Sequence, residues 1–118
     1  MRSVAKLVQE FADSVAAQTD AIWRGDSRTG NKYAKRYIRA FEELRKLGDE
    51  GRDALLPLFL HSRKDVRVSA AAFLLRHRTA EALAVLEAEA RGEGLVSFEA
   101  EQALQRWREG TWSLDPSE

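Results

Sequence analysis

The sequence predicts an all-α fold of five to seven helices, and three observations lead to this prediction. Apolar residues recur at intervals of three, four and seven along nearly the whole chain of 118 residues, which is the period of amphipathic helices. No segment alternates apolar and polar residues for long enough to form a strand. Only two prolines and seven glycines are present, which leaves little room for linkers.

The composition indicates one globular domain. Nineteen Lys and Arg residues balance nineteen Asp and Glu residues, 44% of the chain is hydrophobic and 32% is charged. A chain of this length buries roughly two thirds of its unfolded surface on folding. We therefore expect a single domain over 1–118, made of an N-terminal helical pair (1–48), two helical hairpins (49–110) and a tail (111–118).

In the N-terminal pair, one apolar stripe predicts a first helix that ends before Gly25, with a break near Thr19 left open. This stripe consists of Val4, Leu7, Val8, Phe11, Val15 and Ile22. Residues 24–31 are dense in turn formers and predict a loop, after which Asn31 caps a second helix. The apolar seam of that helix is Tyr33, Tyr37, Phe41 and Leu44. Gly48 then stands at the position just after the helix that favours glycine.

The second half predicts four shorter helices of roughly 8 to 14 residues, joined by tight turns. Their apolar clusters cover 54–60, 66–75, 80–86 and 95–107. Asp65 and Thr79 are the expected N-caps of two of these helices.

A shift of the sequence by 30 residues places the apolar positions of one hairpin on those of the next. Leu56 then falls on Leu86, and Leu74 falls on Leu104. We expect Leu56, Leu74 and Leu86 to be buried between two hairpins with matching cores.

Two resemblances sharpen the fold prediction. The residues Leu55-Leu56-Pro57-Leu58, then Asp65-Val66-Arg67 followed by a run of alanines at 70–72, resemble a HEAT repeat. The segments 48–57, 82–87 and 98–112 are similar to DUF2019, a small bacterial family of unknown function. These resemblances imply a compact HEAT-like α-solenoid, with no catalytic residues to carry over. The second repeat lacks the Asp-Val-Arg signature, which indicates a terminal, capping repeat.

Several classes of function are not predicted. The absence of cysteine excludes disulfides, thiolate metal sites and cysteine nucleophiles. His61 and His77 have no third ligand at a suitable spacing, so we expect no metal and no cofactor. The carboxylates of Asp49, Glu50 and Asp53 are explained by the dipole of a helix start, and no catalytic residue or enzyme activity is predicted.

The location follows from two further features of the sequence. No apolar run approaches the roughly 20 residues needed to cross a membrane. No signal peptide is visible at the N-terminus. We therefore expect a cytoplasmic protein without membrane contact.

A cluster of cations on the second helix and in the loop before it gives the best functional signal. On one face of the helix it consists of Lys32, Lys35, Arg36 and Arg39, and Arg28 lies in the loop. Residues 24–46 carry eight basic and three acidic groups, whereas residues 81–118 carry three basic and nine acidic groups. Three interpretations stay open: a solvated face neutralised by the pairs Glu42–Lys46 and Arg39–Glu43, a site for an acidic protein, or a site for nucleic-acid phosphates.

The tail adds a last candidate, Trp112, which either folds back over the last helix or forms an exposed anchor. Stacked helical hairpins offer extended surfaces rather than catalytic groups. We therefore predict a non-catalytic protein-interaction module with an acidic protein partner, in its sharpest form an immunity or inhibitor protein that neutralises a toxin or effector. The alternatives are a phosphate-binding protein for nucleic acid and a structural subunit of a larger assembly. The oligomeric state stays open.

Overall fold

The computed structural model describes residues 2–116, and these residues contain helices and no strand, which confirms the all-α prediction. The helices are α1 (Val4–Trp23), α2 (Ser27–Lys46), α3 (Asp49–Asp53), the 3₁₀-helix η1 (Leu56–Leu60), α4 (Lys64–Phe73), α5 (Thr79–Ala90) and α6 (Leu95–Glu109). They form two compact units, the first ending at Leu58 and the second beginning at Phe59. None of the described helices is long and apolar enough to span a membrane.

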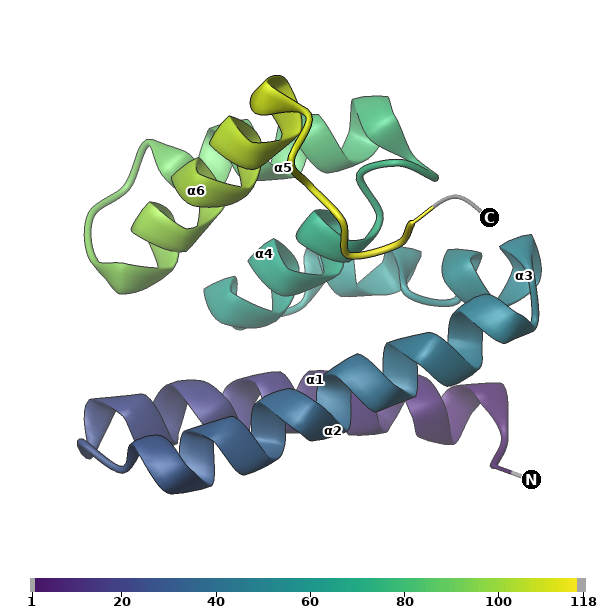
Figure 1. The fold of residues 1–118 in the computed structure, drawn as a ribbon, viewed down its shortest axis with the longest axis horizontal. Helices are drawn as coiled ribbons and strands as arrows, with labels where there is room; N and C mark the ends of the chain where they lie inside the picture. The colour runs from purple at the N-terminus through teal and green to yellow at the C-terminus, as the bar shows by residue number, and fades with distance from the viewer. Residues whose placement is uncertain (1, 117–118) are drawn as a thin grey trace. The chain divides into compact units, whose positions relative to one another are not determined.

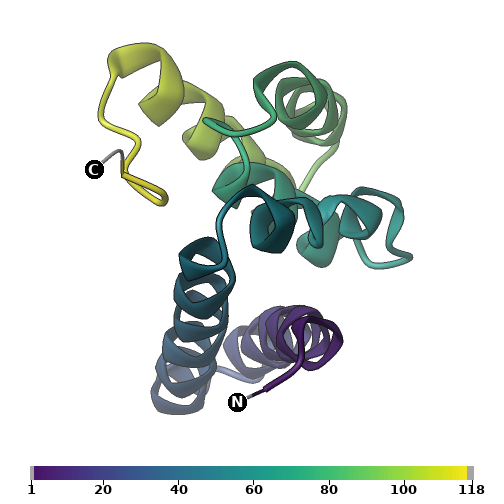
Figure 2. The ribbon, with the colours of Figure 1, turned by 90° about the vertical axis from the view of Figure 1, so that its right-hand side faces the viewer.

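In the first unit, α1 and α2 lie side by side as a helical hairpin (Figure 1), and Figure 2 shows α1 nearly along its axis. Its core is formed by members of the apolar stripes predicted from the sequence: Leu7, Phe11 and Val15 of α1 and Phe41 and Leu44 of α2 are buried. Ile22, the last residue of the first predicted stripe, is exposed instead. The rings of Phe11 and Tyr37 meet edge to face with centroids 5.8 Å apart. α1 continues through Thr19 without a break.

The predicted loop over 24–31 is wrong, because α2 already begins at Ser27. Gly25 has a φ of 75°, a conformation that glycine adopts without strain, so the three residues 24–26 suffice to connect α1 and α2. Asp26 caps α2 in place of Asn31, which lies inside the helix. Gly30 is buried in the same helix, close to the side chain of Ile22 in α1. Packing against α1 therefore keeps the turn-forming residues in a helix.

Gly48 follows α2 with a φ of 80°, as its predicted position requires. The single helix predicted over 54–60 is wrong, because the chain forms the short α3 and then η1. Pro57 has no N–H to donate, which disfavours a continuous α-helix there. Leu56, expected in the core, is only partly buried, while its neighbour Leu55 is fully buried.

In the second unit, α4, α5 and α6 pack around one apolar core. The buried members are Val68, Ala71, Leu75, Ala82, Leu86, Ala100, Ala103 and Leu104. Leu74 and Leu86 are fully buried, as the repeat comparison predicted. α5 and α6 lie next to each other and form the hairpin expected at the end of the repeat (Figure 1).

The predicted N-caps of this unit are wrong by one or two residues. Arg63 and Arg78 stand at the N-cap positions of α4 and α5. Asp65 lies in the first turn of α4, where its buried carboxylate pairs with the Arg63 guanidinium at 2.9 Å. The hydroxyl of Thr79 donates to the carbonyl oxygen of Leu75 at 2.6 Å. The Asp65 carboxylate also accepts the backbone N–H of Val66 at 2.9 Å, so it bonds within the first turn of α4 although it is not the N-cap residue.

Candidate protein-interaction surface

The five predicted contact cations are all exposed and follow one another along α2. We call this surface the basic face; it consists of Arg28, Lys32, Lys35, Arg36 and Arg39. Residues three and four apart on a helix project to the same side, which brings the five side chains together. Among the described residues, no acidic group forms an ion pair with any of the five.

The two pairs expected to neutralise this face are not formed. The carboxylate of Glu43 instead pairs with the guanidinium of Arg2, which also reaches Glu10. Glu42 is exposed and forms no ion pair with Lys46. Neither of the two acids therefore forms the pair that was expected to neutralise the basic face.

Tyr33 lies at the border of the basic face. The Lys32 ammonium and the Arg36 guanidinium lie 6.0 Å and 5.1 Å from the centre of its ring. Cations at these distances are attracted by the ring quadrupole, which restrains their positions. The half-buried ring of Tyr33 therefore attracts two of the five cations of the basic face.

An open hollow of about 470 Å³ borders this face between α1 and α2. Tyr33 and Arg36 line its α2 side, while Glu10 and Asp13 line its α1 side. The amide of Gln9 donates to the Asp13 carboxylate at 2.8 Å, which fixes that acid on α1. The positive surface thus ends where the acids of α1 begin.

Trp112 folds back onto the second unit. Its indole Nε1 donates a hydrogen bond of 2.9 Å to the carbonyl oxygen of Ala72 in α4. Its ring meets that of Trp107 edge to face, with centroids 5.4 Å apart. Gly110 makes this return possible, because its φ of 76° reverses the chain after α6. Of the two alternatives for the tail, the structure therefore has the folded-back one.

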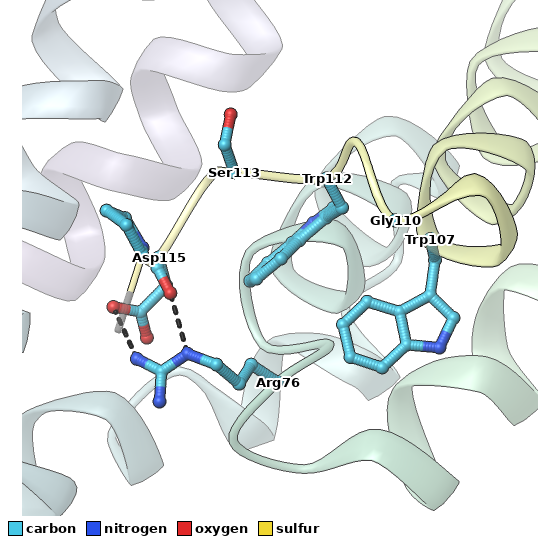
Figure 3. Close-up of a pocket in the computed structure, with 7 residues that line it drawn as sticks. Arg76, Trp107, Gly110, Trp112, Ser113 and Asp115 are labelled. Atoms are coloured by element: carbon cyan, nitrogen blue, oxygen red, sulfur yellow. Dashed lines mark hydrogen bonds and ion pairs between the residues drawn. The ribbon is translucent and has the colours of Figure 1, made fainter. Parts of the chain in front are cut away.

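The returning tail lines one side of an open hollow of about 440 Å³ (Figure 3). Arg76 holds the tail, since its Nε donates to the Asp115 carbonyl oxygen at 2.7 Å and its terminal nitrogen lies 3.1 Å from the Asp115 carboxylate. Asp115 is fully buried, and its charge is balanced by this ion pair. The two charged groups that line the hollow are thus engaged with each other.

The histidines and carboxylates singled out in the sequence belong to other parts of the chain than α2. His61 Nδ1 accepts the backbone N–H of Arg63 at 3.0 Å, and its carbonyl oxygen accepts the Arg67 guanidinium at 2.8 Å. No group of three or more potential ligands among residues 2–116 could hold a metal ion. The acids at positions 49, 50 and 53 lie in the short α3, where Asp49 is 3.6 Å from Arg52.

The sequence analysis did not predict that the carboxyl groups of Glu99 and Asp65 influence each other. Although Glu99 as a whole is exposed, partial burial of its carboxyl group, followed by the charge of Asp65, raises its pKa. Nearby, the Lys64 ammonium donates to the Ser97 hydroxyl, which is buried between α4 and α6. Positions so far apart in the chain share no local pattern, so only the packing of α4 on α6 brings them together.

Two exposed apolar side chains were also missed. Trp23 is 73% exposed at the end of α1, and Leu60 is 90% exposed at the end of η1. Trp23 directly follows Ile22 and is off the apolar stripe by one helical position, which was the available signal. Leu60 lies in a segment predicted to be a regular helix, so its exposure had no signal in the periodicity.

The comparisons with known proteins agree with this fold. The crystal structure of the protein RPA1889 from Rhodopseudomonas palustris CGA009 is similar to this chain, with a TM-score of 0.89 and 25% sequence identity. The similarity covers 96% of this chain and 94% of that one. Among curated proteins, no sequence matches significantly. The model of the "Domain of unknown function (DUF2019)" family matches residues 5–106, and the chain therefore belongs to the DUF2019 family.

Proposed function

We propose that this chain is a non-catalytic protein-interaction module whose basic face binds an acidic surface of another protein. The observation that carries the proposal is the row of five exposed cations on α2 without an acidic partner. Aligned charges of one sign attract a complementary surface and raise the rate of association. The HEAT-like resemblance of residues 55–75 supports the same class, because stacked hairpins serve as binding surfaces in that family.

Nucleic acid is the second candidate for the same face. Its phosphates would match the cations, and each contact would make binding more sensitive to salt. One observation favours a protein instead. The whole chain is neutral, which weakens non-specific attraction to nucleic acid.

In its sharper form, the module is an immunity or inhibitor protein of the cytoplasm that covers the active or docking surface of a toxin or effector. Its small size and the charge difference between its segments support this version. An acidic partner with a fast, electrostatically steered association would suit a protein that must act before its target does.

The test compares two charge reversals of equal size. Lys35→Glu with Arg36→Glu reverses the centre of the basic face, whereas Arg106→Glu with Arg108→Glu reverses two exposed cations of α6 and serves as the control. Wild type and both double variants are immobilised and exposed to extract of the native host, with and without nuclease. Captured proteins are identified by mass spectrometry, and association rates are measured with the purified partner.

The proposal expects one acidic protein that binds wild type and the α6 control at equal rates and binds the α2 reversal at least about tenfold more slowly. The difference should shrink at high salt, because screening acts over about 10 Å at 0.1 M. Equal association by all three proteins would remove the basic face from the interface. Nuclease-sensitive capture of nucleic acid alone, lost in the α2 reversal, would favour the phosphate-binding candidate instead.

A further inference from the structure

The hollow between α1 and α2 has charged groups of both signs on its walls. Its volume is about 470 Å³. Lys6, Glu10 and Asp13 line it from one side of α1, because residues three and four apart project to the same side of a helix. Tyr33 and Arg36 line it from α2. We call this surface the α1–α2 hollow.

A buried serine also lines the α1–α2 hollow. Ser14 is only 3% exposed, and its hydroxyl forms no hydrogen bond with any residue in the range 2–116. Every fully buried side-chain nitrogen or oxygen among the described residues has a hydrogen-bond partner, so a hydroxyl without one must open to the hollow. Polar groups in protein interiors are normally satisfied by protein, water or a ligand. The Ser14 hydroxyl is therefore available to a molecule that enters the hollow.

Three charged groups of the hollow have no ion-pair partner among the described residues. They are the Lys6 ammonium, the Arg36 guanidinium and the Asp13 carboxylate. Glu10 differs from them, because the guanidinium of Arg2 pairs with its carboxylate. The amide of Gln9 orients Asp13 with a hydrogen bond of 2.8 Å but, being neutral, leaves its charge in place. Two positive charges and one negative charge thus remain unpaired.

These three groups are spread around the hollow and do not pair with one another. Lys6 and Asp13 are two helical turns apart, which is about 10 Å along α1. Arg36 projects from the other helix, where its guanidinium lies 5.1 Å from the centre of the Tyr33 ring and is restrained by it. The volume of the hollow falls within the range of about 300–1,000 Å³ that is usual for small-molecule sites. A small molecule with charges of both signs therefore fits between them.

We propose that the α1–α2 hollow binds a free acidic α-amino acid. Such a molecule carries two carboxylates and one ammonium group at neutral pH, which complements two cations and one carboxylate on the protein. One ligand carboxylate pairs with the guanidinium of Arg36, whose planar fork suits this group, and the other pairs with Lys6. The ligand ammonium pairs with Asp13, and the Ser14 hydroxyl donates to a carboxylate oxygen.

This binding does not require the protein partner proposed for the basic face. Arg36 belongs to both surfaces, whereas Lys6, Asp13 and Ser14 are in α1 and outside the basic face. A test with the purified chain and small molecules alone therefore succeeds or fails independently of the proposed function.

The test titrates the full chain with L-glutamate and follows backbone amide signals by NMR, over a range that covers a Kd of about 1 mM. The ionic strength is held constant, because salt screens the charges. Glutarate lacks the ammonium group and γ-aminobutyrate lacks the α-carboxylate. The α-amide of L-glutamate represents the first residue of a peptide, which distinguishes a peptide end from a free amino acid.

Three variants each remove one charge from the hollow at an exposed position: Lys6→Met, Asp13→Asn and Arg36→Met. Lys35→Met and Glu42→Gln remove the same charges at exposed positions outside the hollow and are the matched controls. Circular dichroism verifies that each variant keeps its helices.

We expect saturable binding of L-glutamate by the wild type, with the largest shifts around Ser14 and Tyr33, and weaker binding of all three analogues. Each hollow variant should weaken glutamate binding about threefold to tenfold, and the two controls should leave it unchanged. Asp13→Asn is the decisive variant. It makes the hollow more positive, yet it should weaken the binding of glutamate and not that of glutarate, because only glutamate has an ammonium group for Asp13.

Three results would overturn the proposal. The first is the absence of saturable shifts with L-glutamate. The second is equal binding of L-glutamate and any of the three analogues; with the α-amide, this result would assign the hollow to a peptide end instead. The third is an Asp13→Asn variant that binds L-glutamate as tightly as the wild type or more tightly, which would mean that any anion is attracted to the two cations.

Discussion

The indole Nε1 of Trp112 donates a hydrogen bond of 2.9 Å to the carbonyl oxygen of Ala72, 40 residues earlier in the chain. Ala72 is in the last turn of α4, where carbonyl groups have no partner within the helix. The tail thus satisfies a helix end that the helix itself leaves open. Together with the bonds from Arg76 to Asp115, this contact makes residues 111–115 part of the second unit.

Two substitutions of Trp112 distinguish the contribution of its hydrogen bond to stability from the contribution of its ring packing. Trp112→Phe keeps an aromatic ring against Trp107 and removes the N–H, so we expect a loss of about 1 kcal/mol in the free energy of unfolding. Trp112→Ala also removes the ring packing and should cost about 2 to 3 kcal/mol, less than for a fully buried tryptophan. Urea denaturation followed by circular dichroism measures both. Losses below about 0.5 kcal/mol in both variants would show that the tail contributes nothing to stability.

Two leucines of the second unit make a matched pair for core packing. Leu74 is fully buried, and Leu74→Ala should lower the free energy of unfolding by about 2 to 5 kcal/mol, because a cavity replaces its side chain. Leu60 is 90% exposed, and Leu60→Ala should change stability by no more than about 0.5 kcal/mol. Denaturant curves at low protein concentration give both values. Equal losses in the two variants would contradict the burial pattern.

Two glycines of the first unit should respond to alanine in opposite directions. A Cβ at Gly51 would lie 1.9 Å from the carbonyl oxygen of Leu44, so Gly51→Ala must displace α3 from the end of α2 and should strongly destabilise the unit. A Cβ at Gly30 meets its nearest side chain, Ile22, at an ordinary 3.6 Å. Gly30→Ala should therefore stabilise α2 by about 0.5 to 1 kcal/mol. Thermal denaturation that shifts both variants in the same direction would refute this comparison.

The N-cap of α2 predicts a pH effect. Hydrogen bonds from Thr29, first from its side chain and then from its backbone N–H, hold the pKa of Asp26 below its ordinary value of about 3.9. Because the folded pKa is the lower one, the stabilisation is complete above the unfolded pKa and is lost as the pH falls through the folded pKa.

The variant Asp26→Asn keeps an N-capping side chain but cannot titrate. The stability difference between wild type and this variant should therefore favour the wild type more at pH 6 than at pH 2. Denaturation curves recorded at both pH values measure the change. Parallel stability curves across this range would show that the carboxylate charge of Asp26 does not stabilise the helix.

Local patterns determined much of this protein. The apolar period of 3.6 residues predicted the all-α fold. Phe11 and Phe41 of the predicted stripes are buried, whereas Ile22, the last residue of the first stripe, is 41% exposed. Gly48 was recognised from the requirement for a positive φ after a helix. The cations at positions 32, 35, 36 and 39 were predicted to be solvent-exposed because they share the side of the helix opposite its apolar seam, and all four are exposed.

Contacts between distant residues decided the rest. Whether the basic face is neutralised depended on Glu43, which the sequence paired with Arg39 and the structure pairs with Arg2, 41 residues away. The choice between an anchored and a free Trp112 depended on a carbonyl oxygen of α4. The start of α2 at Ser27 depended on the packing of Gly30 against α1. Periodicity reports only which side of a helix is apolar, whereas partners and exposure are set by the elements that pack against that helix, and those are fixed only in the folded chain.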